Sequence, residues 1–152
     1  MYDAMPIETL EKVGEAFPSR LIVMLYDEAI DSLIAAMDAI GKGDIEARFN
    51  ATARTAEVIS QLYLALDMEE GGEIAESLSG IYSFILTQLP RINFDNDPDT
   101  AEQAIKLLRP IRDSWFELDE RIRAEVADAE AQGYAIEAAV LASRGLADEG
   151  TG

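Results

Sequence analysis

The chain has 152 residues, 49% of them hydrophobic, which is the length and composition of one globular domain. It contains neither cysteine nor histidine, so disulfides are excluded and the commonest general base and metal ligand of enzymes are missing. Its 30 acidic and 12 basic residues give a net charge of −18, which repels nucleic-acid phosphates and anionic membrane surfaces.

Residues 1–18 are predicted to form a short segment outside the main fold, interrupted by Pro6, Gly14 and Pro18. This segment has neither the basic start nor the apolar stretch of a signal peptide. The longest apolar run, residues 21–26, is far shorter than the roughly 20 residues that a membrane span needs. We therefore expect a cytoplasmic protein without membrane insertion.

The first long helix is predicted from residue 19 to about residue 40. Ser19 follows Pro18 and is the expected N-cap. The glycines on either side of Lys42 are expected to end the helix, because glycine adopts the left-handed conformation common at helix C-termini. Apolar residues recur every three or four positions, as in a buried stripe: Ile22, Leu25, Ala29, Leu33, Ala36 and Ile40.

Two further helices are predicted in the middle of the chain. Asp44 is the expected N-cap of the second helix, which runs to about Asp67, and residues 71–72, both glycine, separate it from a third helix that begins at Glu73. Pro90 is expected to disturb or end the third helix, because proline has no N–H and restricts the residue before it. The predicted stripes are Ile45, Phe49, Ala53, Ala56, Ile59, Leu62, Tyr63 and Leu66, then Ile74, Leu78, Ile81, Ile85 and Leu89.

A fourth helix is predicted after a loop of turn-forming residues, 93–98. Asp97 is the expected N-cap and Pro98 the first helical residue. Pro110 is expected to kink the helix and Gly133 to end it. The predicted buried stripe is Ala101, Ala104, Leu108, Ile111, Trp115, Leu118 and Ile122.

Four amphipathic helices with short connections favour an all-α fold, an antiparallel up-down four-helix bundle. We predict an N-terminal segment at residues 1–18, the bundle at residues 19–133, and a minor fifth helix with a tail at residues 134–152. The tail from Gly145 is expected to be disordered.

The many carboxylates do not form a recognisable metal site. Di-iron bundles use Glu-x-x-His pairs, which a chain without histidine cannot supply. Residues 95–99 resemble a fragment of a calcium loop but lack the glycine and the glutamate that such a loop requires. Acidic residues such as Asp31 and Asp38 lie on polar faces, as solvated residues do. We therefore expect no metal, no cofactor and no catalysis.

Some apolar residues fall on otherwise polar helix faces: Val23, Leu64, Phe84 and Phe116. Single exposed apolar residues are ordinary, so each is either an unremarkable surface residue or a contact for a partner. The face of Phe84 is the most suggestive, because Ser77 and Gly80 beside it are small and leave room for a partner helix.

Five segments of the chain occur in an order and spacing typical of one protein family. They are Leu21-Ile22-Val23-Met24-Leu25-Tyr26-Asp27 with Ala29-Ile30, Ala56-Glu57-Val58-Ile59-Ser60-Gln61-Leu62 with Leu66-Asp67, Gly71-Gly72-Glu73-Ile74-Ala75 with Leu78, Ile81-Tyr82 and Leu89, Ile92-Asn93 before Asn96-Asp97, and Leu107-Leu108 through Arg112-Asp113-Ser114-Trp115. Together they resemble the FliS family of flagellin export chaperones over roughly residues 19–118.

The resemblance implies an antiparallel helical bundle that binds the disordered C-terminal segment of flagellin. Such a chaperone prevents premature polymerisation of flagellin and helps to deliver it to the flagellar export gate. The alternative is a helical adaptor or regulatory protein that binds an export component or an anti-sigma factor. The export gate and an anti-sigma factor are therefore further candidate partners.

The candidate partner-binding residues combine the apolar residues on polar faces with residues that match the family. For Tyr26, Tyr82 and Trp115, packing in the core is the competing role. The full set of candidates is Val23, Tyr26, Ile59, Leu62, Tyr63, Leu64, Gly80, Ile81, Phe84, Trp115 and Phe116.

Overall fold

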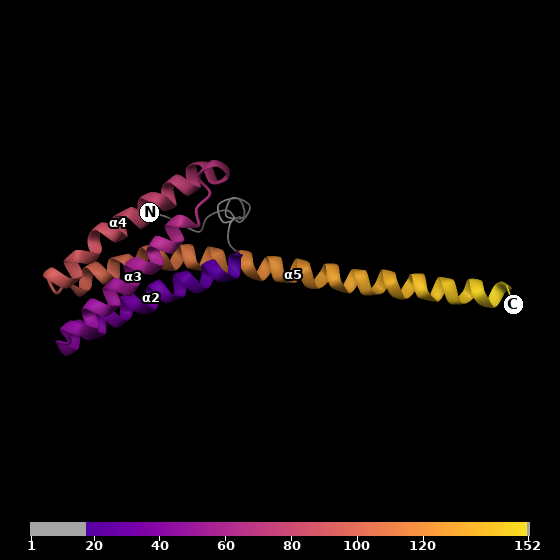
Figure 1. Ribbon diagram of the computed structural model, residues 1–152, viewed down its shortest axis with the longest axis horizontal. Coiled ribbons are helices and arrows are strands. Elements are labelled where there is room, and N and C mark those ends of the chain that lie inside the picture. Colours follow the sequence, from indigo (N-terminus) through magenta and orange to yellow (C-terminus); the bar gives the residue numbers. More distant parts are fainter. Residues whose placement is uncertain (1–17, 152) are drawn as a thin grey trace. The chain divides into compact units, whose positions relative to one another are not determined.

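The structure, a computed structural model, describes the backbone of residues 18–151 and the side chains of residues 18–144. These residues form four helices and no strand, which confirms the all-α class. The helices are α2 (Ser19–Lys42), α3 (Ile45–Leu64), α4 (Met68–Phe94) and α5 (Pro98–Thr151) (Figure 1). The predictions made for residues 1–17 lie outside the described residues.

The chain divides into two units, one ending at Asp119 and the other beginning at Glu120. In the first unit, α2, α3, α4 and the beginning of α5 form the predicted helical bundle (Figure 1). The second unit contains the remainder of α5.

Contacts between helix ends show that neighbouring helices of the bundle are antiparallel. The hydroxyl groups of Tyr63, near the end of α3, and Ser79, in the first half of α4, are 3.2 Å apart. At the opposite end, Arg48 Nη1 near the start of α3 donates to Asn96 Oδ1, just after α4, at 2.8 Å. Because the end of each helix meets the start of the other, α3 and α4 run in opposite directions.

The same holds for α2 and α5. Ser19 Oγ at the start of α2 donates to Asp119 Oδ1 at 3.0 Å. Further along α2, Asp27 Oδ1 accepts from Arg112 Nε of α5 at 2.7 Å. The residue numbers rise along one helix while they fall along the other, so these two helices are also antiparallel.

The predicted stripes of α2, α4 and α5 form the bundle core, with Ile40, Ile74 and Ile122 only half-buried. The stripe predicted for α3 is only partly correct. Its second half is buried at Ile59 and Leu62, but Ile45 and Phe49 in the first half are exposed. The largest side chains that are fully buried are Tyr26, Leu33, Ile59, Leu62, Leu78, Tyr82, Ile85, Ile92, Leu108, Ile111 and Leu118.

Two of the three predicted helix caps are confirmed. Asp44 Oδ1 accepts from the backbone N–H of Ala47 at 3.0 Å, and Asp97 Oδ1 accepts from that of Asp99 at 2.9 Å. The prediction for Ser19 is wrong, because Pro18 occupies the cap position and Ser19 is already helical. The hydroxyl of Ser19 instead bonds to the carboxylate of Asp119, so a contact between helices replaces the local cap.

The helix boundaries around the central glycines differ from the prediction. α3 ends at Leu64 and not near Asp67, because the Asp67 carboxylate caps the next helix by accepting from the N–H groups of Glu69 and Glu70. α4 therefore includes one turn before the predicted start. The predicted break is present at Gly72, whose φ of 51° and ψ of −129° are not helical.

The prolines do not end the helices that contain them. α4 continues past Pro90 to Phe94, so of the two expected effects of Pro90 the structure excludes the end of the helix. The prediction that Asn93 begins the loop is wrong. The residues beyond Pro90 are held by packing and by a side-chain bond, since Ile92 is buried and Asn93 Nδ2 donates to Thr52 Oγ1 at 2.8 Å. α5 likewise continues through Pro110.

The predicted end of the last helix at Gly133 is also wrong, because α5 continues to Thr151. A glycine inside a helix costs only about 1 kcal/mol relative to alanine. The neighbours of Gly133 are mostly alanine, glutamate and glutamine, which are strong helix formers. The separate fifth helix and the disordered tail from Gly145 are therefore replaced by one continuous helix.

Candidate partner-binding surface

The interior of the bundle contains two tyrosines in contact. Tyr26 and Tyr82 are both fully buried, and their hydroxyl groups are hydrogen-bonded to each other. Burial is the main reason that the pKa of each phenol is raised above its ordinary value of 10.0. In this structure both side chains are part of the core, which is the competing role considered for them above.

Most of the apolar candidates predicted from family likeness are also core residues. The clearest correction is Val23, which was predicted on a polar face but is only 7% exposed. The buried arc of α2 is wider than a single stripe and includes Val23 and Ile30 as well as Ile22. The candidates buried in this way are Val23, Tyr26, Ile59, Leu62, Ile81 and Trp115.

The other candidates are exposed, as a contact role requires. Leu64 is the most exposed of them, and Tyr63, Phe84 and Phe116 each present part of their side chain to solvent. A Cβ added at Gly80 would meet no atom within 4 Å, so the surface there is open. These residues come from α3, α4 and α5.

Phe116 is an exposed candidate whose ring is held in place by a neighbouring side chain. The guanidinium of Arg112 lies over the Phe116 ring, 4.7 Å from its centroid. Arg112 is itself held by the Asp27 carboxylate of α2, which raises the pKa of the guanidinium. The ring is therefore presented at the surface in a fixed position.

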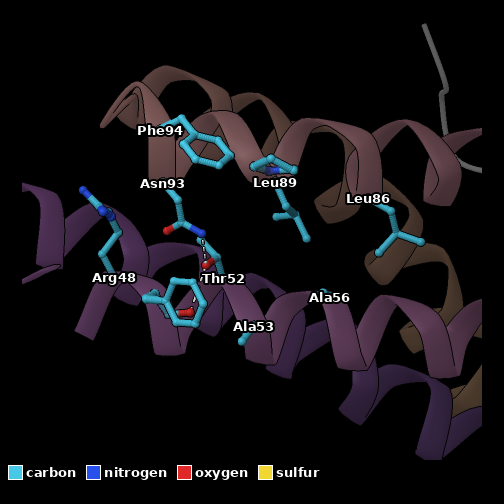
Figure 2. Close-up of a pocket in the computed structure, with 10 residues that line it drawn as sticks. Arg48, Thr52, Ala53, Ala56, Leu86, Leu89, Asn93 and Phe94 are labelled. Carbon is cyan, nitrogen blue, oxygen red and sulfur yellow. Dashed lines mark hydrogen bonds between the residues drawn. The ribbon is translucent and has the colours of Figure 1, made fainter. Parts of the chain in front are cut away.

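A groove between α3 and α4 was not predicted from the sequence. It has a volume of about 490 Å³ and is open to solvent along the two helices (Figure 2). Small side chains form its α3 wall at Ala53 and Ala56, and two exposed phenylalanines stand at one end. The lining residues are Arg48, Phe49, Thr52, Ala53, Ala56, Leu86, Leu89, Pro90, Asn93 and Phe94.

The exposed aromatic rings show that this groove is an unfilled apolar surface. Phe49 is 60% and Phe94 88% exposed, although both are large apolar residues. Figure 2 shows Phe94 on α4 and, beside it, the hydrogen bond that joins Asn93 of α4 to Thr52 of α3. Phe49 lines the groove from α3. A partner that filled the groove would remove these rings from water, which is the usual source of affinity in a helix-binding groove.

Polar atoms without partners lie at the same end of the groove. Arg48 Nε and Asn93 Oδ1 are buried and have no hydrogen-bond partner among the described residues. Pro90 also cannot donate to the carbonyl of Leu86, one turn before it, because proline has no N–H. Both side-chain atoms are covered, so the surface that the groove presents is mainly apolar.

Two features of the sequence are related to this groove. Phe94 lies among turn-forming residues, where a large aromatic side chain has no core to enter. Pro90 lies near the end of an otherwise regular apolar stripe, where it frees a carbonyl group. Neither signal indicates a groove alone, because its walls come from helices that only the fold brings together.

The sequence model of the family described as "Flagellar protein FliS" matches residues 2–122 of this chain. The chain belongs to the FliS family. The match spans every helix of the bundle described above, so the resemblance inferred from the five sequence segments is confirmed.

Several curated members of the FliS family are similar to the chain over most of their own length. The flagellar secretion chaperone FliS of Salmonella typhimurium is 33% identical over 125 residues, which cover 78% of this chain and 93% of the relative. The protein of the same name from Vibrio cholerae is 30% identical over 107 residues, covering 70% and 79%. That of Campylobacter jejuni is 33% identical over 107 residues, covering 70% and 84%.

The described residues contain neither a cluster of metal ligands nor a membrane-spanning helix. No group of three or more histidine, cysteine, aspartate or glutamate side chains in this part of the chain is arranged to hold a metal ion. None of the described helices has an apolar stretch long enough to cross a membrane.

Proposed function

We propose that this protein is a flagellar secretion chaperone that binds the C-terminal segment of flagellin in the cytoplasm, without catalysis. Membership of the FliS family supports the chaperone role. The open groove between α3 and α4 supports the binding of a flagellin segment, because its form suits an amphipathic helix. The bound segment would keep its polymerising surface covered until export.

The groove suits a helix that is apolar on one face. Ala53 and Ala56 leave space for branched apolar side chains, and Phe49 and Phe94 would close over them. Removal of these rings and of the partner's apolar face from water would supply the affinity.

Binding of a disordered segment also explains how the cargo can be released. A segment that folds as it binds loses conformational entropy, and this loss lowers the affinity that a given buried area produces. The net charge of −18 opposes association between chaperones whose apolar grooves are empty. The charge therefore keeps the empty apolar grooves of different chains from associating with one another.

The test is a calorimetric titration of the full chain with the C-terminal segment of flagellin, followed by circular dichroism of the mixture. We expect one-to-one binding with a negative heat-capacity change and a gain of helix. The absence of binding by a folded chain would contradict the proposal and favour a helical adaptor with a different partner.

A matched pair of substitutions locates the site. Ala53→Arg places a long charged side chain in the groove, whereas Ala35→Arg places the same side chain on the exposed face of α2. We expect Ala53→Arg to weaken binding at least roughly tenfold, which corresponds to about 1.4 kcal/mol, and Ala35→Arg to leave it unchanged. Equal effects of the two variants would exclude the groove as the binding site.

A further inference from the structure

The helix α5 extends well past the region that the FliS family shares. The family match ends at residue 122, whereas α5 continues to Thr151. Apart from the half-buried Ile122, every side chain from residue 120 to residue 144 is exposed. These side chains include Val126, Ile136 and Val140, which are 51%, 65% and 43% exposed.

The apolar residues of this extension follow the spacing of a coiled coil. Steps of four and three residues alternate without interruption through Ile122, Val126, Ala129, Gly133, Ile136 and Val140. Alternating steps of this kind place all six residues along one seam of a helix, where they pack against a second helix. We call these six residues the seam.

The seam is symmetric about Ala131. If a second copy of the helix lies antiparallel with Ala131 at the centre, Ile122 faces Val140 of the second copy and Val126 faces Ile136 of the second copy. Each of these pairs then occurs twice, as a two-fold symmetric interface requires. All the large residues of the seam are β-branched, and each of them meets another β-branched residue.

The centre of the seam allows the two helices to approach closely. Ala129 faces Gly133 of the second copy in the same arrangement. A Cβ added at Gly133 would meet no atom within 4 Å in the single chain, so this surface is open. Two pairs of such small residues would let the backbones come together while the larger residues pack on either side.

Charges beside the seam favour the antiparallel arrangement over the parallel one. In the antiparallel pair, Arg123 lies beside Glu137 of the second copy, and this attractive pair occurs twice. In a parallel pair, Glu125 would instead lie beside Glu130 of the second copy, a repulsive pair that also occurs twice. The antiparallel pair has one like-charged contact, between Glu130 and its equivalent near the two-fold axis.

We propose that the extension of α5 is a self-association element, through which two copies of this chain form an antiparallel dimer. A second copy is the occupant because the seam is complementary to itself in size and in charge. The seam has six residues on each side, whereas a standard interface has roughly 20–30 residues a side. The dimer is therefore weak and depends on protein concentration.

Sedimentation equilibrium of the full chain over a range of concentrations tests the dimer. We expect the apparent mass to rise from the 16.6 kDa of one chain towards twice that value. Val126→Lys combined with Ile136→Lys places charges in the seam and should keep the mass at that of one chain. Tyr134→Lys changes an exposed residue outside the seam and should leave the self-association as it was.

Two results would overturn the proposal. One is a single-chain mass at every concentration, and the other is a dimer that persists in the double variant. Because all of these residues lie outside the bundle core, circular dichroism should show that each variant keeps its helix content. Flagellin is absent from the experiment, so its failure would leave the proposed chaperone function untouched.

The direction of the two helices can be tested because the natural chain contains no cysteine. We expect a mixture of Val126→Cys protein and Ile136→Cys protein to form disulfide-linked mixed dimers in preference to dimers of either variant with itself. Preferential linking of Val126→Cys protein to itself would contradict the antiparallel arrangement.

Discussion

The two halves of α3 have the same apolar periodicity but opposite environments. In the second half, Ile59 and Leu62 of the predicted stripe are buried in the core. In the first half, Phe49 of the same stripe is 60% exposed, and Thr52, which is polar, is only 4% exposed. A regular apolar stripe on one helix therefore does not show whether the stripe faces the core or a partner.

The buried threonines explain how the first half of α3 packs without its large apolar residues. Thr55 Oγ1 donates to the carbonyl of Ala51 at 2.9 Å, and Thr52 Oγ1 donates to that of Phe49 at 2.9 Å. Each hydroxyl thus donates its hydrogen bond within its own helix. Small residues of this kind fill the narrow core at this level, and the larger residues remain outside to form the groove.

The largest expected effect is a contrast in stability between these two halves. Ile59→Ala should lower the free energy of unfolding by about 2–5 kcal/mol, because it leaves a cavity in the core. Phe49→Ala should change it by no more than about 0.5 kcal/mol, because the ring is mostly in water. Urea unfolding of the two variants with an unchanged m-value measures the difference. Equal losses would mean that Phe49 packs in the core in solution.

The sequence was sufficient for the fold class and for the order of the helices. It predicted the caps at Asp44 and Asp97, because a cap is a local interaction between residues two or three positions apart. It failed at Ser19, whose hydroxyl bonds to Asp119, a hundred residues away. Local signals were therefore reliable where no distant residue competed for the same group.

The candidate surface was less predictable for the same physical reason. Faces were assigned from the pattern on one helix at a time, so Val23 was placed outside the core when α2 in fact buries a wide arc. The groove requires Ala53 of α3 and Leu86 of α4 to face each other, which neither helix pattern contains. Likewise, the helix propensity of the alanine-rich stretch around Gly133 outweighed the break that the glycine predicted.

The second-largest expected effect is a dependence of stability on pH, caused by the tyrosines in the core. The Tyr82 ring lies 6.3 Å, between centroids, from both Tyr26 and Tyr63. Because burial raises the pKa of Tyr26 and Tyr82 above 10.0, the folded state keeps both phenols neutral when the unfolded chain would ionise. The free energy of unfolding should therefore be constant up to about pH 10 and then fall by about 1.4 kcal/mol per pH unit for each tyrosine.

Chemical denaturation at a series of alkaline pH values measures this slope. Tyr26→Phe combined with Tyr82→Phe removes both ionisable groups, so the steep fall above pH 10 should disappear in that variant. Tyr134→Phe is the matched control, since Tyr134 is exposed and should leave the slope unchanged. A slope that is the same in all three proteins would contradict the assignment of the loss to the buried pair.

The smallest expected effect concerns the bond that holds the groove end of α4 to α3. Thr52 Oγ1 accepts from Asn93 Nδ2 at 2.8 Å, three residues beyond Pro90. Thr52→Val keeps the shape of the side chain but removes this acceptor, and should cost about 1 kcal/mol of unfolding free energy. Ser60→Ala is the control, because that hydroxyl bonds only within α3 on an exposed face and its loss should be nearly neutral.

A double-mutant cycle of Thr52→Val with Asn93→Ala separates this bond from other effects of the two changes. If the bond between the helices is what carries α4 past Pro90, the two substitutions together should cost about 1 kcal/mol less than the sum of their separate costs. Strict additivity would mean that burial of Ile92 alone holds the last turn. In that case the half-buried Asn93 would be free to turn its amide towards a partner in the groove.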